Sequence, residues 1–273
     1  MPRAITLAAV AVLMLCCVAP ALIADALAAP LERVELEGAS QPRVPGERIQ
    51  GYLAKPEGAG PFPAVIALHG CAGMHEATKQ KLADDLVAWG YVALLVDSFA
   101  TRGIVHACTG GISANTRTAD AYGALAFLAR QTFVDPQRVG AIGFSQGAWI
   151  ALVLADNYSV ELFARPINLR FRAAAALYPP CRFVGLRPGI PTLILIGALD
   201  DWTPAADCSH KVAFWGTDGP PIDLVVYPGV HHSFYYSYLQ PGMTMFGHWL
   251  AYNGEAADDA TRRIRQFLDR HLN

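Results

Sequence analysis

The segment at residues 138–155, RVGAIGFSQGAWIALVLA, constrains the fold more than any other part of the 273-residue chain. Residues 139–142 form a short apolar run typical of a buried strand, and the residues from Gln146 onward have helical spacing. Between them the chain reads G-x-S-x-G, so it must turn sharply at Ser145, and the glycines prevent collisions of Cβ atoms. The turn exposes the Ser145 hydroxyl beside a helix N-terminus, where negative charge is favoured. A glycine-rich turn whose serine merely caps the helix is the alternative.

The rest of the chain alternates buried strands with amphipathic helices. Two alternating strand-like pieces lie within residues 31–54, and buried strands are expected at 64–68, 91–96, 139–142, 172–178, 191–196 and 222–227. Helices are expected at 76–89, 116–131, from 146, at 204–215 and at 255–272. This alternation predicts a single α/β domain whose mostly parallel, doubly wound sheet is covered by helices on both faces, with no large cap domain.

The first 28 residues do not belong to this domain. Arg3 supplies a positive charge, residues 4–23 are almost uninterruptedly apolar, and residues 26–28 form an A-x-A cleavage site. We expect a signal peptide at 1–28, a single domain at 29–273, and export to the periplasm or the medium. An uncleaved N-terminal membrane anchor is the alternative.

The four cysteines that follow the signal peptide are expected to form disulfides, because an exported chain enters an oxidising compartment. Four cysteines allow three pairings. In the predicted sheet, Cys71 and Cys108 follow adjacent strands, as do Cys181 and Cys208, and we expect these two pairs. No histidine has a carboxylate or thiol at metal-ligand spacing, so we expect neither a metal nor another cofactor. The formal net charge of -2, without a basic stripe, gives no reason to expect nucleic acid as a partner.

A serine becomes a nucleophile when a histidine takes its proton and a carboxylate orients that histidine. Asp200 and Asp201 follow one predicted strand, and His231 and His232 follow the last one. Serine, acid and histidine therefore occur in the chain order of α/β-hydrolases, each at a strand end. The sequence predicts a Ser-His-Asp hydrolase and leaves the choice within each pair open.

The oxyanion of an ester-cleavage intermediate needs N–H donors. We expect them to be the backbone amides of Gln146 and of Cys71, in the glycine-containing loop after residues 64–68. His69, Arg102, His106 and Phe234 are candidate substrate contacts. The alternatives are solvated loop side chains for Arg102 and His106, and core packing for the aromatic segment that contains Phe234.

Across about residues 50–272 the chain resembles the dienelactone hydrolase family. The matching pieces are LHGCAG, YVALLVDSFATRG, RVGAIGFSQGA, LYPPC, LILIGALDDWTP, VYPGVHHSF and EAADDATRRIRQFL. The resemblance implies that Asp200, in G-x-x-D-x-x-x-P, is the acid and that His232, before Ser-Phe, is the base. The best-known members have a cysteine at the elbow and a glutamate in the oxyanion loop. This chain has Ser145 and His69-Gly70 there, and so resembles the exported, serine-bearing branch.

These features together predict a monomeric, exported carboxylic ester hydrolase that acts on a small-molecule ester or lactone through an acyl-enzyme, with no membrane contact after signal cleavage. Other hydrolases on the same fold are the alternative, namely a peptidase, an amidase or a polyester depolymerase. An acyltransferase would need the same three residues. A non-catalytic binding protein would have no reason to retain them.

Overall fold

The elements of the fold follow the predicted alternation. The computed structural model describes residues 1, 28–40, 45–164 and 168–273, so the predicted signal peptide lies almost entirely outside the described residues. The strands of the main sheet are β1 (Glu32–Glu37), β2 (Arg48–Ala54), β3 (Phe62–Leu68), β4 (Val92–Asp97), β5 (Val134–Phe144), β6 (Ala173–Leu177), β7 (Thr192–Gly197) and β8 (Ile222–Tyr227). The helices are α1 (Glu76–Ala88), α2 (Ala114–Leu128), α3 (Gln146–Leu154), α4 (Asn157–Ser159), α5 (Ala205–Trp215) and α6 (Gly254–Leu272). Shorter elements are 3₁₀ turns at Ala100–Arg102, Cys181–Phe183 and Ser237–Leu239, a π-helical turn at Val160–Ala164, and a hairpin of β9 (Met243–Met245) and β10 (His248–Leu250).

The main sheet has eight strands in the order β1-β2-β4-β3-β5-β6-β7-β8. The first two pairings, β1 with β2 and β2 with β4, are antiparallel, and every later pairing is parallel. The predicted mostly parallel sheet of the α/β-hydrolase fold is therefore confirmed. After β3 the chain moves outward to β4 and then returns past β3 to β5. In such sheets this switch point opens a crevice at the carboxyl ends of the strands, where ligands bind.

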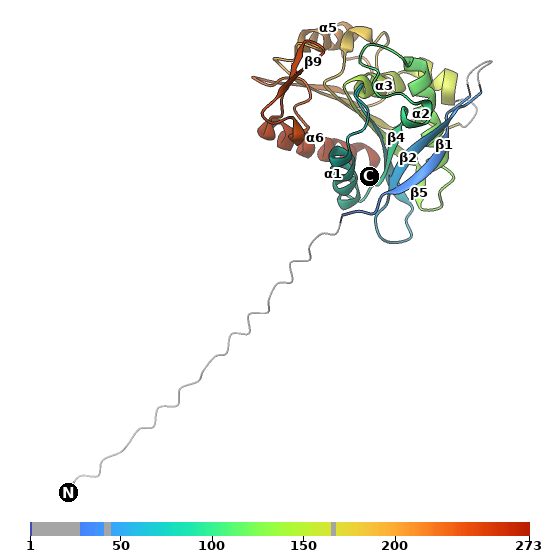
Figure 1. Ribbon diagram of the computed structural model, residues 1–273. Coiled ribbons are helices and arrows are strands. Elements are labelled where there is room, and N and C mark those ends of the chain that lie inside the picture. Colours follow the sequence, from blue (N-terminus) through green and yellow to red (C-terminus); the bar gives the residue numbers. More distant parts are fainter. Residues whose placement is uncertain (2–27, 41–44, 165–167) are drawn as a thin grey trace.

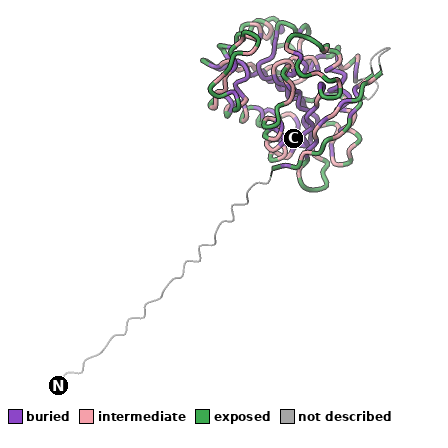
Figure 2. Tube along the Cα trace, viewed as in Figure 1, coloured by how far each residue is buried: buried purple, intermediate pink, exposed green. Residues whose placement is uncertain are grey.

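Helices cover the sheet on both faces, with α1 and α6 on one side and α2, α3 and α5 on the other (Figure 1). The central strands are consequently apolar on both faces, and in β6 every residue is buried. Figure 2 shows this buried layer running through the middle of the molecule. The closing helix α6 turns a stripe of apolar residues to the sheet, including Ile264 and Leu268, and its Asn253 cap accepts a hydrogen bond from Ala256 N.

Two features depart from the sequence expectation. Strand β5 begins at Val134, five residues before the apolar run, because its first part continues along β3 beyond an irregularity at Phe62/Ala64. The β9–β10 hairpin was not expected, since its strands contain three residues each and carry no periodicity. Within the described part of the chain, no helix is both long and apolar enough to cross a membrane.

Candidate active site

Ser145 lies at the predicted turn between β5 and α3, with φ 52° and ψ -115°, a conformation that an L-residue adopts only under constraint. The glycines on either side permit it. A Cβ on Gly143 would lie 2.1 Å from Gly147 O, and one on Gly147 would lie 2.1 Å from Leu68 O. The serine backbone is fixed because its N–H donates to Leu177 O at 2.9 Å. The strained turn therefore presents the hydroxyl at the switch point of the sheet.

His232 connects this hydroxyl to a carboxylate. Its Nε2 lies 3.1 Å from Ser145 Oγ, and its Nδ1 lies 2.7 Å from Asp200 Oδ2. His232 is 1% exposed and Asp200 is 4% exposed, so the contact between them is shielded from water, whereas the contact with Ser145 borders the pocket. Gly197 makes this approach possible, since a Cβ there would lie 2.2 Å from Val230 O in the loop that carries the histidine. The three side chains form one continuous chain of contacts.

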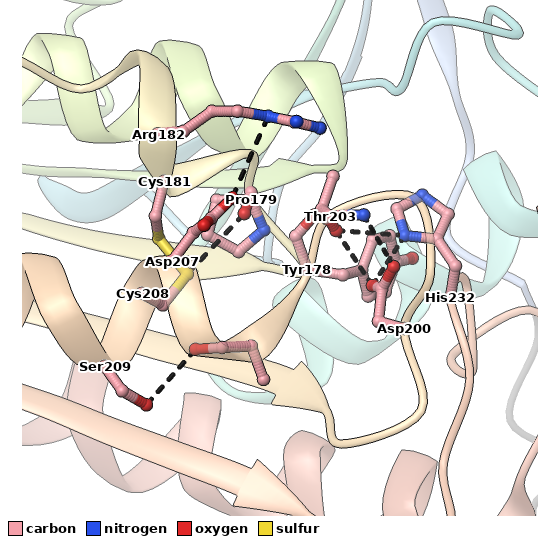
Figure 3. The surroundings of a disulfide bond; sticks show 11 residues. Tyr178, Pro179, Cys181, Arg182, Asp200, Thr203, Asp207, Cys208, Ser209 and His232 are labelled. Atoms are coloured by element: carbon pink, nitrogen blue, oxygen red, sulfur yellow. Dashed lines mark hydrogen bonds and ion pairs between the residues drawn. A yellow bond between two sulfur atoms is a disulfide. The ribbon is translucent and has the colours of Figure 1, made fainter.

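Asp200 is held by donors from its own loop (Figure 3). The N–H groups of Trp202 and Thr203 donate to its Oδ1 at 3.0 and 2.7 Å. The Thr203 hydroxyl lies 2.8 Å from Oδ2, 3.1 Å from Tyr178 O and 3.2 Å from His232 Nδ1. Sequence reasoning missed Thr203, although a threonine three residues after the acid was the available signal.

The neighbouring candidates of each pair lie apart from this chain of contacts. Asp201 is exposed, and its Oδ1 lies 3.6 Å from His248 Nδ1. The His231 ring contacts the backbone oxygen of Leu199 at 3.1 Å. The geometry thus brings Asp200 and His232 to Ser145 and leaves Asp201 and His231 outside.

The loop after β3 passes beside the serine, since a Cβ on Gly70 would lie 3.5 Å from Ser145 Cβ. The Cys71–Cys108 disulfide joins this loop to the long loop after β4, and Ala107 N donates to Cys71 O at 2.7 Å. The other disulfide joins Cys181 to Cys208, so the structure contains both expected pairs.

His69 is buried in this loop and is neutral. Burial and, secondly, the nearby charge of Arg117 lower its pKa from 6.5 to about 3. Since Ser98 N–H donates to its Nε2 at 3.3 Å, the ring proton is on Nδ1, which donates to Gly70 O at 2.7 Å. His69 lines the pocket and shapes the loop through these two bonds.

The N–H groups of Cys71 and Gln146 are the predicted oxyanion donors. Among the residues described, neither Cys71 N nor Gln146 N donates a hydrogen bond. Gln146 is the first residue of α3, so its N–H has no partner within the helix. Both belong to segments that border Ser145, as an oxyanion site requires.

The cavity next to Ser145 has a volume of about 80 Å³ and is mostly apolar. Its walls include Met74, Leu82, Leu95, Phe144, Tyr236 and Leu239. Lys79 also lines it, but its Nζ already contacts Glu76 Oε2 at 2.7 Å and lies 3.6 Å from the centre of the Tyr52 ring. No cluster of three potential metal ligands occurs within residues 28–40, 45–164 and 168–273.

Three candidate substrate contacts do not line this cavity. Arg102 is engaged in a buried ion pair: its two terminal nitrogens donate to the two Asp120 oxygens at 2.8 and 2.9 Å, and its Nε pairs with Glu47. His106 contacts Phe246, with the ring centres 5.3 Å apart. Phe234 is fully buried among aromatic rings of the core. Ion pairing thus uses the side chain of Arg102, and core packing uses that of Phe234. His106 is exposed, and its contact with substrate stays a prediction.

The model of the dienelactone hydrolase family matches residues 49–272. A putative carboxymethylenebutenolidase of Methylorubrum extorquens is 26% identical over 232 residues, covering 81% of this chain and 76% of the relative. One from Synechocystis is 26% identical over 247 residues, covering 84% and 95%. The structure of a putative dienelactone hydrolase from Klebsiella pneumoniae superposes with a TM-score of 0.68 at 22% identity, covering 89% of this chain and 100% of that one. An esterase from Pyrococcus furiosus superposes with a TM-score of 0.63 at 17% identity, covering 90% and 94%.

Proposed function

Because the chain belongs to the dienelactone hydrolase family and is a carboxylic ester hydrolase, we propose that it is an exported serine esterase that cleaves small apolar esters or lactones through an acyl-enzyme. The observation that carries this proposal is the continuous contact from Asp200 through His232 to Ser145 at the strained turn.

In the first half-reaction, Ser145 Oγ attacks the carbonyl carbon of the ester while its proton passes to His232 Nε2. Asp200 accepts a hydrogen bond from His232 Nδ1, which fixes the ring and stabilises the imidazolium. The carbonyl oxygen becomes an oxyanion that accepts hydrogen bonds from the N–H groups of Cys71 and Gln146. The intermediate collapses as the bond to the alcohol oxygen breaks, and His232 returns the proton to that oxygen.

In the second half-reaction, water replaces the alcohol. His232 takes a proton from the water as its oxygen attacks the acyl carbon, and the same two N–H groups hold the new oxyanion. The ester bond to Ser145 then breaks and the proton returns to Oγ. The carboxylic acid leaves, and the enzyme is restored.

The cavity indicates the substrate class. Its apolar wall favours an uncharged hydrocarbon group, and a volume of about 80 Å³ holds roughly half a dozen water-sized groups. We propose short apolar acyl groups, with lactones included because relatives named carboxymethylenebutenolidases share the family.

Two features support action outside the cytoplasm, and we propose that the enzyme acts there as a monomer on small molecules. The chain has two disulfides, and disulfides form and persist mainly in oxidising compartments. The N-terminal 28 residues have the composition of a secretory signal. Expression of the full-length chain with N-terminal sequencing of the exported product tests this, and cleavage after Ala28 is the expected result.

Matched substitutions test the reaction mechanism with p-nitrophenyl butyrate as substrate. Asp200→Asn should lower kcat by about 10⁴-fold, and His232→Ala should lower it by about 10⁶-fold. Asp201→Asn and His231→Ala, at the adjacent positions, should leave kcat within about threefold of wild type. The Asp201 side chain contacts His248 and the His231 ring contacts Leu199 O, so neither belongs to the chain of contacts that ends at Ser145. Equal effects within either pair would contradict the assignment.

A further inference from the structure

Arg117 is a buried cation behind the site that the reaction described above does not use. It lies on α2, and only 1% of it is exposed. One terminal nitrogen donates to His69 O at 2.8 Å, and the other donates to Gln146 Oε1 at 2.9 Å. The guanidinium carbon also lies 5.4 Å from the centre of the Phe99 ring.

A direct ion pair does not explain this residue. Within the described part of the chain, no carboxylate lies within ion-pair distance of Arg117, and its Nε has no hydrogen-bond partner. The nearby Asp120 instead pairs with Arg102. Burial lowers the pKa of Arg117 to about 10, so it remains charged at neutral pH. An unpaired buried charge with an unsatisfied donor is costly, and an apolar side chain would fill the position at lower cost.

What Arg117 does contact are the two segments that carry the proposed oxyanion donors. His69 begins the loop that contains Cys71, and Gln146 carries the second N–H itself. Ala107 also connects these two segments: Gln146 Nε2 donates to Ala107 O at 3.4 Å, and Ala107 N donates to Cys71 O at 2.7 Å. Gln146 and the Cys71 loop are thus connected twice, once through Arg117 and once through Ala107.

We propose that Arg117 is a positioning residue for the oxyanion site: it fixes the spacing between the Cys71 and Gln146 N–H groups and places a permanent positive charge behind them. This inference rests on the proposed function, since it assumes that these two groups hold the oxyanion. Preorganised donors and a fixed charge stabilise the transition state and not the bound ester. Loss of Arg117 should therefore lower kcat and leave KM nearly unchanged.

The test compares Arg117→Met and Arg117→Lys with a matched control. The control is Arg187, which is also partly buried, donates to the backbone oxygens of Pro188 and Pro220, and has an Nε without a hydrogen-bond partner. It precedes β7 and so lies at the amino ends of the parallel strands, whereas Ser145 lies at their carboxyl ends. Hydrolysis of p-nitrophenyl butyrate is measured per active site, with active sites counted by titration with a fluorophosphonate. This normalisation removes any loss of folded protein.

Arg117→Met should lower kcat per site by about 10- to 100-fold with KM within about twofold, Arg117→Lys should recover part of the loss, and Arg187→Met should leave kcat within about twofold. Gln146→Met keeps its backbone N–H but removes both the acceptor for Arg117 and the donor to Ala107 O. The loss of kcat in the double variant should be smaller than the product of the two separate losses, because both substitutions remove the same Arg117–Gln146 hydrogen bond. An unchanged kcat in folded Arg117→Met, or multiplicative losses in the double variant, would overturn the inference. An inactive wild type, or an active Ser145→Ala, would instead overturn the proposed function.

Discussion

Removal of the two disulfides, one at a time, separates their roles in stability and in catalysis. Cys71–Cys108 closes a loop with a sequence separation of 37, and Cys181–Cys208 closes one with a separation of 27. The loop-closure entropy that each removes from the unfolded chain corresponds to about 4 kcal/mol at 25 °C in both cases. Replacing either pair by two alanines should therefore lower the free energy of unfolding by nearly the same amount.

Catalysis should respond differently. Cys71 carries one proposed oxyanion N–H, and without its disulfide the loop keeps only hydrogen bonds, such as Ala107 N to Cys71 O. We expect kcat to fall by about 10- to 100-fold, the usual cost of misplacing a catalytic group by about 1 Å. Loss of Cys181–Cys208 leaves the bonds from Trp202 N and Thr203 N to the acid intact, so kcat should stay within about threefold.

The assay is urea unfolding followed by tryptophan fluorescence, with kcat per titrated active site measured on the same preparations. Equal losses of kcat in the two alanine pairs would refute the argument, because they would show that kcat follows stability alone. A loss of less than 1 kcal/mol in either pair would refute the loop-closure estimate.

Three further predictions concern single side chains. Thr203→Val removes a hydroxyl that lies 2.8 Å from Asp200 Oδ2, and should cost about 2 kcal/mol of stability in urea unfolding and lower kcat measurably. His69→Gln should make the free energy of unfolding depend less steeply on pH in acid. The pKa of His69 is about 3 in the folded protein and 6.5 in the unfolded chain, so its contribution to stability is complete above pH 6.5. This contribution declines by about 1.4 kcal/mol per pH unit as the pH falls toward 3. Unfolding free energies at pH 7 and pH 5 check this, and equal slopes in both proteins would contradict it. Arg102→Met should cost about 3 kcal/mol or more, because Asp120 is left buried without its partner, while KM stays unchanged; a raised KM would instead restore Arg102 as a substrate contact.

The parts of the fold that could be predicted are those with strong local patterns. The turn at Ser145 is marked by an apolar run, a glycine pair and a helical stretch within 18 residues, and local sterics leave few other conformations. Asp200 and His232 follow predicted strands, so parallel pairing brings them to the same edge as Ser145. Choosing them over Asp201 and His231 required the family resemblance, because adjacent residues at a strand end carry the same local signal.

Residues whose roles depend on distant partners could not be assigned in this way. Arg117 is four residues before Ala121 and so lies on the inner face of a predicted helix, but its acceptors are 29 and 48 residues away in sequence. Arg102 reaches Asp120 across the long loop, so its sequence context matches that of a solvated side chain. Long-range hydrogen bonds, and not propensity, decide what such side chains do.

The most direct test of the central claim is covalent labelling of the purified protein with a fluorophosphonate, followed by mass spectrometry of its peptides. The account predicts one labelled site, Ser145, with labelling abolished in Ser145→Ala and strongly slowed in His232→Ala, while both variants keep the wild-type circular dichroism spectrum. A folded wild type that does not react, or a label on another residue, would contradict it.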